Sequence, residues 1–93
     1  MSTKRILLVE DEQPIREMVS FALGQEGYVI DEAEDGRSAE LQIANNSPNL
    51  ILLDWMLPDV SGLELIRRWK REELLQEIPV IMLTARAEER DRV

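Results

Sequence analysis

Four short apolar runs alternate with longer amphipathic segments, and this pattern constrains the fold more than any other feature of the chain. The runs cover residues 5–11, 28–33, 50–54 and 80–84. Three of them are continuously apolar, as in strands buried on both faces, and the second is more polar, as in an edge strand. Strands that alternate with helices indicate βαβ units, so we expect an α/β fold with a doubly wound, mostly parallel sheet.

The segments between the runs predict the helices. Pro14 suits the first turn of a helix, and Gly27 is a natural stop at its end. Between them, one apolar stripe with helical spacing is formed by Ile15, Met18, Val19, Ala22 and Leu23. Further helices are expected over residues 37–45 and 63–73, and another begins within residues 86–93.

Composition excludes several classes of function. The 93 residues are enough for one small domain, and 44% hydrophobic and 32% charged residues are typical of a soluble globular chain. No signal peptide and no apolar run of membrane-spanning length is visible, so we expect a cytoplasmic protein without membrane contact. The absence of Cys and His removes thiolate and imidazole metal sites. A net charge of -8 argues against direct contact with nucleic acid.

Polar side chains follow the ends of the core runs. Glu10 and Asp11 end the first run, Asp54 ends the third, and Thr84 ends the fourth. In the flavodoxin-like strand order 2-1-3-4-5, the first and third strands are neighbours, so the three carboxylates should meet at one crevice. Such a cluster is costly through like-charge repulsion, and a hard divalent cation offsets that cost. Oxygen ligands with room for several waters describe Mg²⁺.

Each of these residues also has a simpler explanation. Asp11 can cap the following helix, Asp54 can begin a turn, and Thr84 can be a strand-end residue or a helix cap. Turns and caps do not require acids on two adjacent buried strands and a hydroxyl on the next one. The combination therefore favours a functional site.

Three segments resemble the signature motifs of the receiver domains of two-component response regulators. They are ILLVEDE (6–12), LILLDWMLPDVSG (50–62) and IPVIMLTAR (78–86), and the resemblance extends over essentially all 93 residues. The segments at 52–62 and 82–93 are most similar to phosphate-regulon regulators, within the subfamily that joins a receiver to a winged-helix DNA-binding domain.

The resemblance implies a phosphorylation switch rather than an enzyme that acts on other molecules. Asp54 would accept a phosphoryl group from the phosphohistidine of a sensor histidine kinase, and Thr84 would donate its hydroxyl to that group. Mg²⁺ would be held by Asp11, Asp54 and the backbone carbonyl of Met56, and through water by Glu10.

Residues near the acceptor complete the expected site. Pro58 and Gly62 would shape a fixed loop that aims the Met56 carbonyl, and Gly62 would also tolerate a positive φ. Trp55 and Glu89 match positions that border the phosphorylation site, so they would modulate access or lifetime. Packing of Trp55 on neighbouring side chains is an equally good explanation for that residue.

Family receivers continue to a fifth strand bearing a lysine, a last helix and, in this subfamily, a DNA-binding effector domain. We therefore expect residues 1–93 to be one receiver domain that is incomplete at its C-terminus, without the fifth strand, the last helix and the effector domain. The fourth strand would be an exposed apolar edge. This predicts a fragment of a longer molecule, or a homodimer or swapped oligomer, with little stable phosphorylation of the isolated chain.

Two other functions stay open at this point. One is a pseudo-receiver scaffold that docks without being phosphorylated, which retention of the acids and of Thr84 disfavours. The other is a haloacid-dehalogenase-type phosphatase, which also uses a strand-end aspartate with Mg²⁺. That family requires a second acid two residues after the nucleophile, and this chain has Met56 there.

Overall fold

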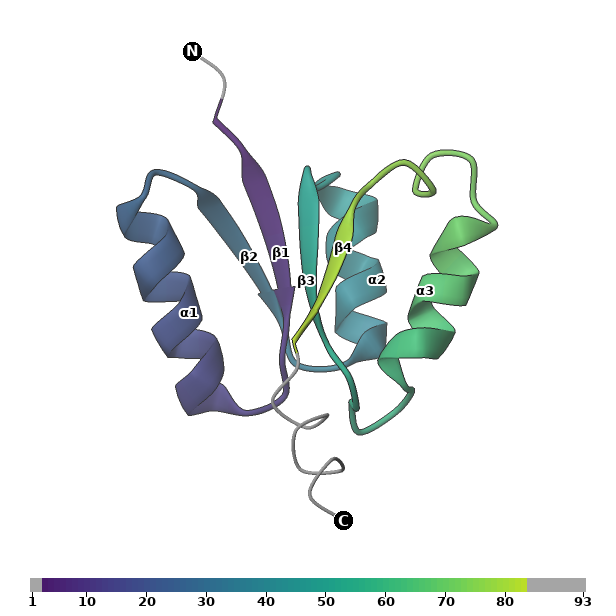
Figure 1. The fold of residues 1–93 in the computed structure, drawn as a ribbon, viewed down its shortest axis with the longest axis horizontal. Coiled ribbons are helices and arrows are strands. Elements are labelled where there is room, and N and C mark those ends of the chain that lie inside the picture. Colours follow the sequence, from purple (N-terminus) through teal and green to yellow (C-terminus); the bar gives the residue numbers. More distant parts are fainter. Residues whose placement is uncertain (1–2, 84–93) are drawn as a thin grey trace.

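The computed structural model describes residues 3–83, in which four strands alternate with three helices (Figure 1). The elements are β1 (Arg5–Val9), α1 (Gln13–Gln25), β2 (Val29–Ala33), α2 (Gly36–Asn45), β3 (Leu50–Asp54), α3 (Gly62–Lys70) and β4 (Val80–Leu83). The expected α/β alternation is confirmed. Thr84, Glu89 and the helix expected within residues 86–93 lie outside the described residues.

All strand pairs of the sheet are parallel, and the order is β2-β1-β3-β4. This agrees with the expected flavodoxin-like order for these four strands. Val9 lies opposite Ala33 of β2 on one side and Leu53 of β3 on the other, so β1 lies between these two strands. The carboxyl ends of the strands share the lower edge of the view in Figure 1, and the helices begin at that edge.

The core lies between the sheet and the helices α2 and α3. Leu7, Val9, Ile51 and Leu53 form one buried cluster with residues of these two helices, among them Leu65. Because side chains alternate along a strand, the intervening residues of β1 face the other side of the sheet, along which α1 runs.

The apolar stripe of α1 is less buried than its spacing predicts. Ile15 and Val19 are half-buried, but Met18 is 65% exposed and Phe21, also on α1, is 68% exposed. Within the described part of the chain, α1 lies along β1 and β2, and the side chains of Met18 and Phe21 stay exposed on it. Only part of the apolar stripe is therefore buried against the sheet.

β1 and α3 each end earlier in the chain than the sequence predicts, at points where the pattern of backbone hydrogen bonds changes. β1 ends at Val9, although the Glu10 amide still donates to the Ala33 carbonyl at 3.0 Å. The helix expected over 63–73 ends at Lys70, because the chain then tightens into turns in which Arg71 donates to Arg68 and Glu72 donates to Trp69.

Gly27 has a φ of 98°, as expected for the residue that stops α1. None of the helices in the described part of the chain combines the length and apolar character that a membrane span requires.

Candidate metal centre

Three carboxylates converge at the carboxyl edge of the sheet. Glu10, Asp11 and Asp54 each offer one oxygen, and these oxygens lie within 4.8 Å of one another. The expected meeting of these side chains is confirmed, because β1 and β3 are paired and Glu10 follows the residue that faces Leu53. Glu10 is 4% exposed and Asp54 is 3% exposed, and Asp11 is the most accessible of the three.

The segment between β1 and α1 is held in place from several sides. The Glu10 carboxylate turns back and accepts a hydrogen bond of 2.9 Å from the Glu12 amide. The Glu10 carbonyl accepts a hydrogen bond of 2.7 Å from the Arg16 guanidinium. Hydrogen bonds from the protein therefore hold both the side chain and the backbone of Glu10 in place without a cation.

The electrostatics of the cluster favour a cation. Burial raises the pKa of Glu10, and the neighbouring charges of Asp54 and Asp11 raise it further, against the opposing effect of the Glu12 amide. Oxygen atoms of Asp11 and Asp54 are also shielded from solvent. A hard cation such as Mg²⁺, which prefers carboxylate oxygens and retains several waters, fits this donor set.

The loop from Trp55 to Ser61, here called the β3–α3 loop, closes on itself beside Asp54. The Gly62 amide donates to the Trp55 carbonyl at 2.8 Å, and Met56 forms an antiparallel bridge with Ser61. The Ser61 hydroxyl caps α3 by accepting from the Glu64 amide at 3.1 Å. The loop is therefore a compact turn joined directly to α3.

Gly62 does not use the tolerance of glycine for a positive φ, since its φ is not positive. A Cβ at position 62 would instead lie 2.5 Å from the Asp54 carbonyl oxygen and 3.2 Å from that of Trp55. Glycine is required here because the first turn of α3 approaches the backbone at the end of β3.

The other expected site residues lie around this loop. Trp55 is half-buried, Pro58 is exposed, and the Met56 side chain is 53% exposed while its backbone pairs with Ser61. The roles of these residues, and the role of the Met56 carbonyl as a ligand, stay predictions.

The sequence did not predict that Asp59 and Arg16 form hydrogen bonds to backbone groups of other segments. Asp59 accepts hydrogen bonds from the amides of Gly36 and Arg37 at 2.9 and 3.0 Å. The Gly36 amide, followed by that of Arg37, lowers the pKa of the Asp59 carboxyl. Nothing in a linear pattern pairs a loop aspartate with a turn more than twenty residues earlier.

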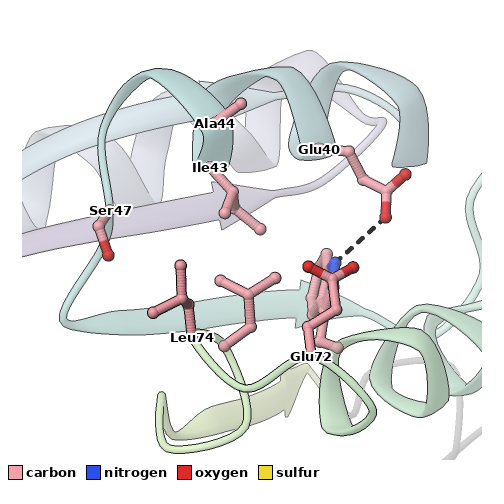
Figure 2. Close-up of a pocket in the computed structure, with 8 residues that line it drawn as sticks. Glu40, Ile43, Ala44, Ser47, Glu72 and Leu74 are labelled. Atoms are coloured by element: carbon pink, nitrogen blue, oxygen red, sulfur yellow. Dashed lines mark hydrogen bonds between the residues drawn. The ribbon is translucent and has the colours of Figure 1, made fainter.

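A separate hollow of about 420 Å³ lies between α2 and α3. Figure 2 shows Ile43 and Leu74 along it, and the Glu40 carboxylate accepts a hydrogen bond of 3.3 Å from the indole N–H of Trp69. Its lining comes from the second half of α2 and the segment around the end of α3, away from the edge where the acids meet (Figure 1). The hollow is therefore not part of the carboxylate site.

Comparison with known proteins identifies the family of the chain. Residues 6–93 match the model of the response regulator receiver domain. Two similar curated proteins are the phosphate regulon transcriptional regulatory proteins PhoB of Escherichia coli and of Pseudomonas aeruginosa, at 59% identity over 90 residues and 54% over 93 residues. These alignments cover 97% and 100% of this chain, but only 39% and 41% of the relatives.

Solved structures give the same answer for the fold. The chemotaxis response regulator CheY4 of Vibrio cholerae matches with a TM-score of 0.84 and 26% identity, over 97% of this chain and 78% of that one. The HemR receiver domain of Leptospira biflexa matches with a TM-score of 0.82 and 35% identity, over 97% and 73%. The expected resemblance is thus confirmed, and this chain belongs to the receiver domain family of response regulators.

Proposed function

We propose that this chain is the phospho-accepting switch of a PhoB-type transcriptional regulator, with Asp54 as the acceptor and a sensor histidine kinase as the donor. The observation that carries the proposal is the convergence of Glu10, Asp11 and Asp54 within 4.8 Å at the carboxyl edge of a receiver fold. Ligands of open α/β sheets bind at this edge, beside the strands where the order reverses.

In the proposed reaction a carboxylate oxygen of Asp54 attacks the phosphorus of the kinase phosphohistidine. An O–P bond forms, the P–N bond breaks, and the imidazole nitrogen keeps the electron pair of the bond that breaks. The product is an acyl phosphate on Asp54. Bound Mg²⁺ would neutralise charge on the phosphoryl oxygens, which is the main requirement of such transfers.

The chain's own residues supply position and a dry environment. Asp11 and Asp54 would bind the cation directly, Glu10 would bind it through water, and the Met56 carbonyl would complete the set. The low exposure of the Asp54 side chain would limit the access of water to an acyl phosphate formed there. Thr84 would donate its hydroxyl to the phosphoryl group, and Trp55 and Glu89 would tune access to it.

The longer protein would use this switch to control transcription. The chain spans 39% of the length of the Escherichia coli relative, whose name describes a transcriptional regulatory protein. Residues 1–93 would form the receiver part of a cytoplasmic regulator, and phosphorylation would change its dimerisation and the activity of an attached DNA-binding domain.

A second copy of the chain is a further proposed partner. Within residues 3–83, β4 pairs with β3 and with no other strand, and Ile81 on β4 is 52% exposed. An apolar edge strand offers unpaired backbone groups to another chain. Light scattering on the isolated chain should show a dimer or higher species, and a stable monomer would contradict this expectation.

Titration with Mg²⁺, followed by tryptophan fluorescence, tests the acceptor site. We expect a saturable change, since Trp55 is next to Asp54, and we expect Asp54→Ala to abolish it. Glu73→Gln, which alters an exposed acid outside the cluster, should leave the curve unchanged. A parent protein without a saturable response would refute the phospho-acceptor function and favour a docking scaffold.

Phosphorylation itself is best tested in the longer regulator. Incubation with its phosphorylated sensor kinase and Mg²⁺ should add one phosphoryl group, which mass spectrometry of peptides would place on Asp54. Labelling that persists in Asp54→Ala would show that another residue is the acceptor.

A further inference from the structure

The first turn of α2 is capped partly by the residue just before the helix and partly by a distant loop. Asp35 precedes the helix and accepts from the Ser38 amide at 2.8 Å. The amides of Gly36 and Arg37 donate instead to Asp59, which lies 23 and 22 positions later in the chain. Amides at the start of a helix have no partner within it, and the N-terminus favours a negative charge. Asp59 therefore holds the β3–α3 loop against α2.

An apolar contact reinforces this polar one. Gly36 is buried, and a Cβ at that position would overlap a methyl group of Val60, the residue after Asp59. The close approach of loop and helix thus needs glycine at position 36. Two neighbouring residues of the loop are held at once, one by hydrogen bonds and one by packing.

The same loop reaches the carboxylate cluster at its other end. Its closure by the Gly62–Trp55 hydrogen bond and the Met56–Ser61 bridge leaves little freedom between its tip and its base. The base is the backbone of Asp54 and Trp55, against which Gly62 packs. Asp59 at the tip and Met56 near the base therefore belong to one short closed turn.

We infer that Asp59 is a positioning residue for the cation site. By fastening the β3–α3 loop to α2, it keeps the Met56 carbonyl beside the Asp54 carboxylate and so raises the affinity of the site for Mg²⁺. This rests on the proposed function, in which that carbonyl is a ligand. Asp59 does not itself touch the cation. Its effect reaches the site through the closed loop.

The test separates positioning from simple helix capping. Asp59→Ala removes the polar contact between loop and helix, whereas Asp35→Ala removes a cap of the same helix that is made to Ser38 of α2. Both variants should lose thermal stability. Fluorescence titration with Mg²⁺ should show affinity weakened about fivefold to tenfold in Asp59→Ala, equivalent to about 1 to 1.4 kcal/mol, since only part of the lost hydrogen-bond energy reaches the cation site through the loop. Asp35→Ala should stay within about twofold of the parent, an effect of a few tenths of a kcal/mol.

A milder variant keeps the test valid if Asp59→Ala does not fold. Asp59→Asn retains one acceptor oxygen, so its affinity should lie between those of the parent and Asp59→Ala. Parental affinity in Asp59→Ala or Asp59→Asn, in a protein whose Asp54→Ala variant no longer binds Mg²⁺, would overturn this inference alone. A parent that does not bind Mg²⁺ would overturn the proposed function together with it.

Discussion

The guanidinium of Arg16 donates a hydrogen bond of 2.7 Å to the backbone carbonyl of Glu10, and its Nε lies 3.2 Å from the carboxylate of Glu32. Only 14% of the Arg16 side chain is exposed. One residue of α1 therefore ties the segment after β1 to β2. This contact orients the backbone that carries two of the three clustered acids.

Replacing Arg16 by Met should destabilise the protein, because the Glu10 carbonyl loses a charged donor and Glu32 loses its ion-pair partner. We expect a loss of about 1 to 3 kcal/mol in the free energy of unfolding, measured by urea denaturation. Arg67→Met is the matched control, since Arg67 is 69% exposed and pairs with Glu64 on the surface at 3.7 Å. That change should cost no more than about 0.5 kcal/mol. Equal losses in the two variants would contradict the anchoring role of Arg16.

Glu10 should make stability depend on pH in the absence of divalent cations. Its pKa is raised in the folded state, so its stabilising contribution is present below the unfolded value near 4.5 and is lost as pH rises through the folded pKa. Glu10→Gln cannot ionise and should not show this loss. At neutral pH in EDTA, urea denaturation should find the variant more stable than the parent.

Saturating Mg²⁺ should shrink or reverse that difference, because the cation would bind through water to the ionised Glu10 carboxylate of the parent. Parallel stability curves for parent and Glu10→Gln between acidic and neutral pH would show that Glu10 carries no burial penalty.

Gly62→Ala should disturb the end of β3, since the added Cβ would meet the Asp54 carbonyl oxygen at 2.5 Å. We expect a loss of about 1 to 3 kcal/mol in the free energy of unfolding. Gly24→Ala is the contrasting control, because nothing lies within 4 Å of a Cβ there and the position is inside α1. Alanine should stabilise that helix by about 0.5 to 1 kcal/mol. Chemical denaturation of both variants measures these changes in the free energy of unfolding. A Gly62→Ala variant as stable as the parent would contradict the close approach of α3 to the end of β3.

Trp69→Phe should lower stability without changing the affinity for Mg²⁺. The indole is 2% exposed, and its N–H donates to Glu40 on the wall of the hollow between α2 and α3. Loss of this bond and of part of the ring should cost about 1 to 2 kcal/mol. The carboxylate cluster lies at the other end of these helices, so a changed Mg²⁺ titration would reveal a coupling that the structure does not suggest.

The sequence by itself determined the alternation of strands and helices and the meeting of Glu10, Asp11 and Asp54. Both follow from short-range pattern: apolar runs mark strands, amphipathic spacing marks helices, and parallel crossovers bring the strand ends to one edge. The resemblance to receivers then implied a role for each of these acids, and the convergence of the three carboxylates agrees with it.

Only the tertiary structure decided how the site is supported. The bond of Asp59 to the start of α2, the bond of Arg16 to the Glu10 carbonyl, and the crowding that requires Gly62 became visible once the elements were packed. Met18 belongs to the predicted apolar stripe of α1 and yet is 65% exposed, because helical spacing predicts an apolar face but not which segments cover it. Local propensity acts over one or two turns of chain, whereas these contacts depend on how distant segments pack against each other.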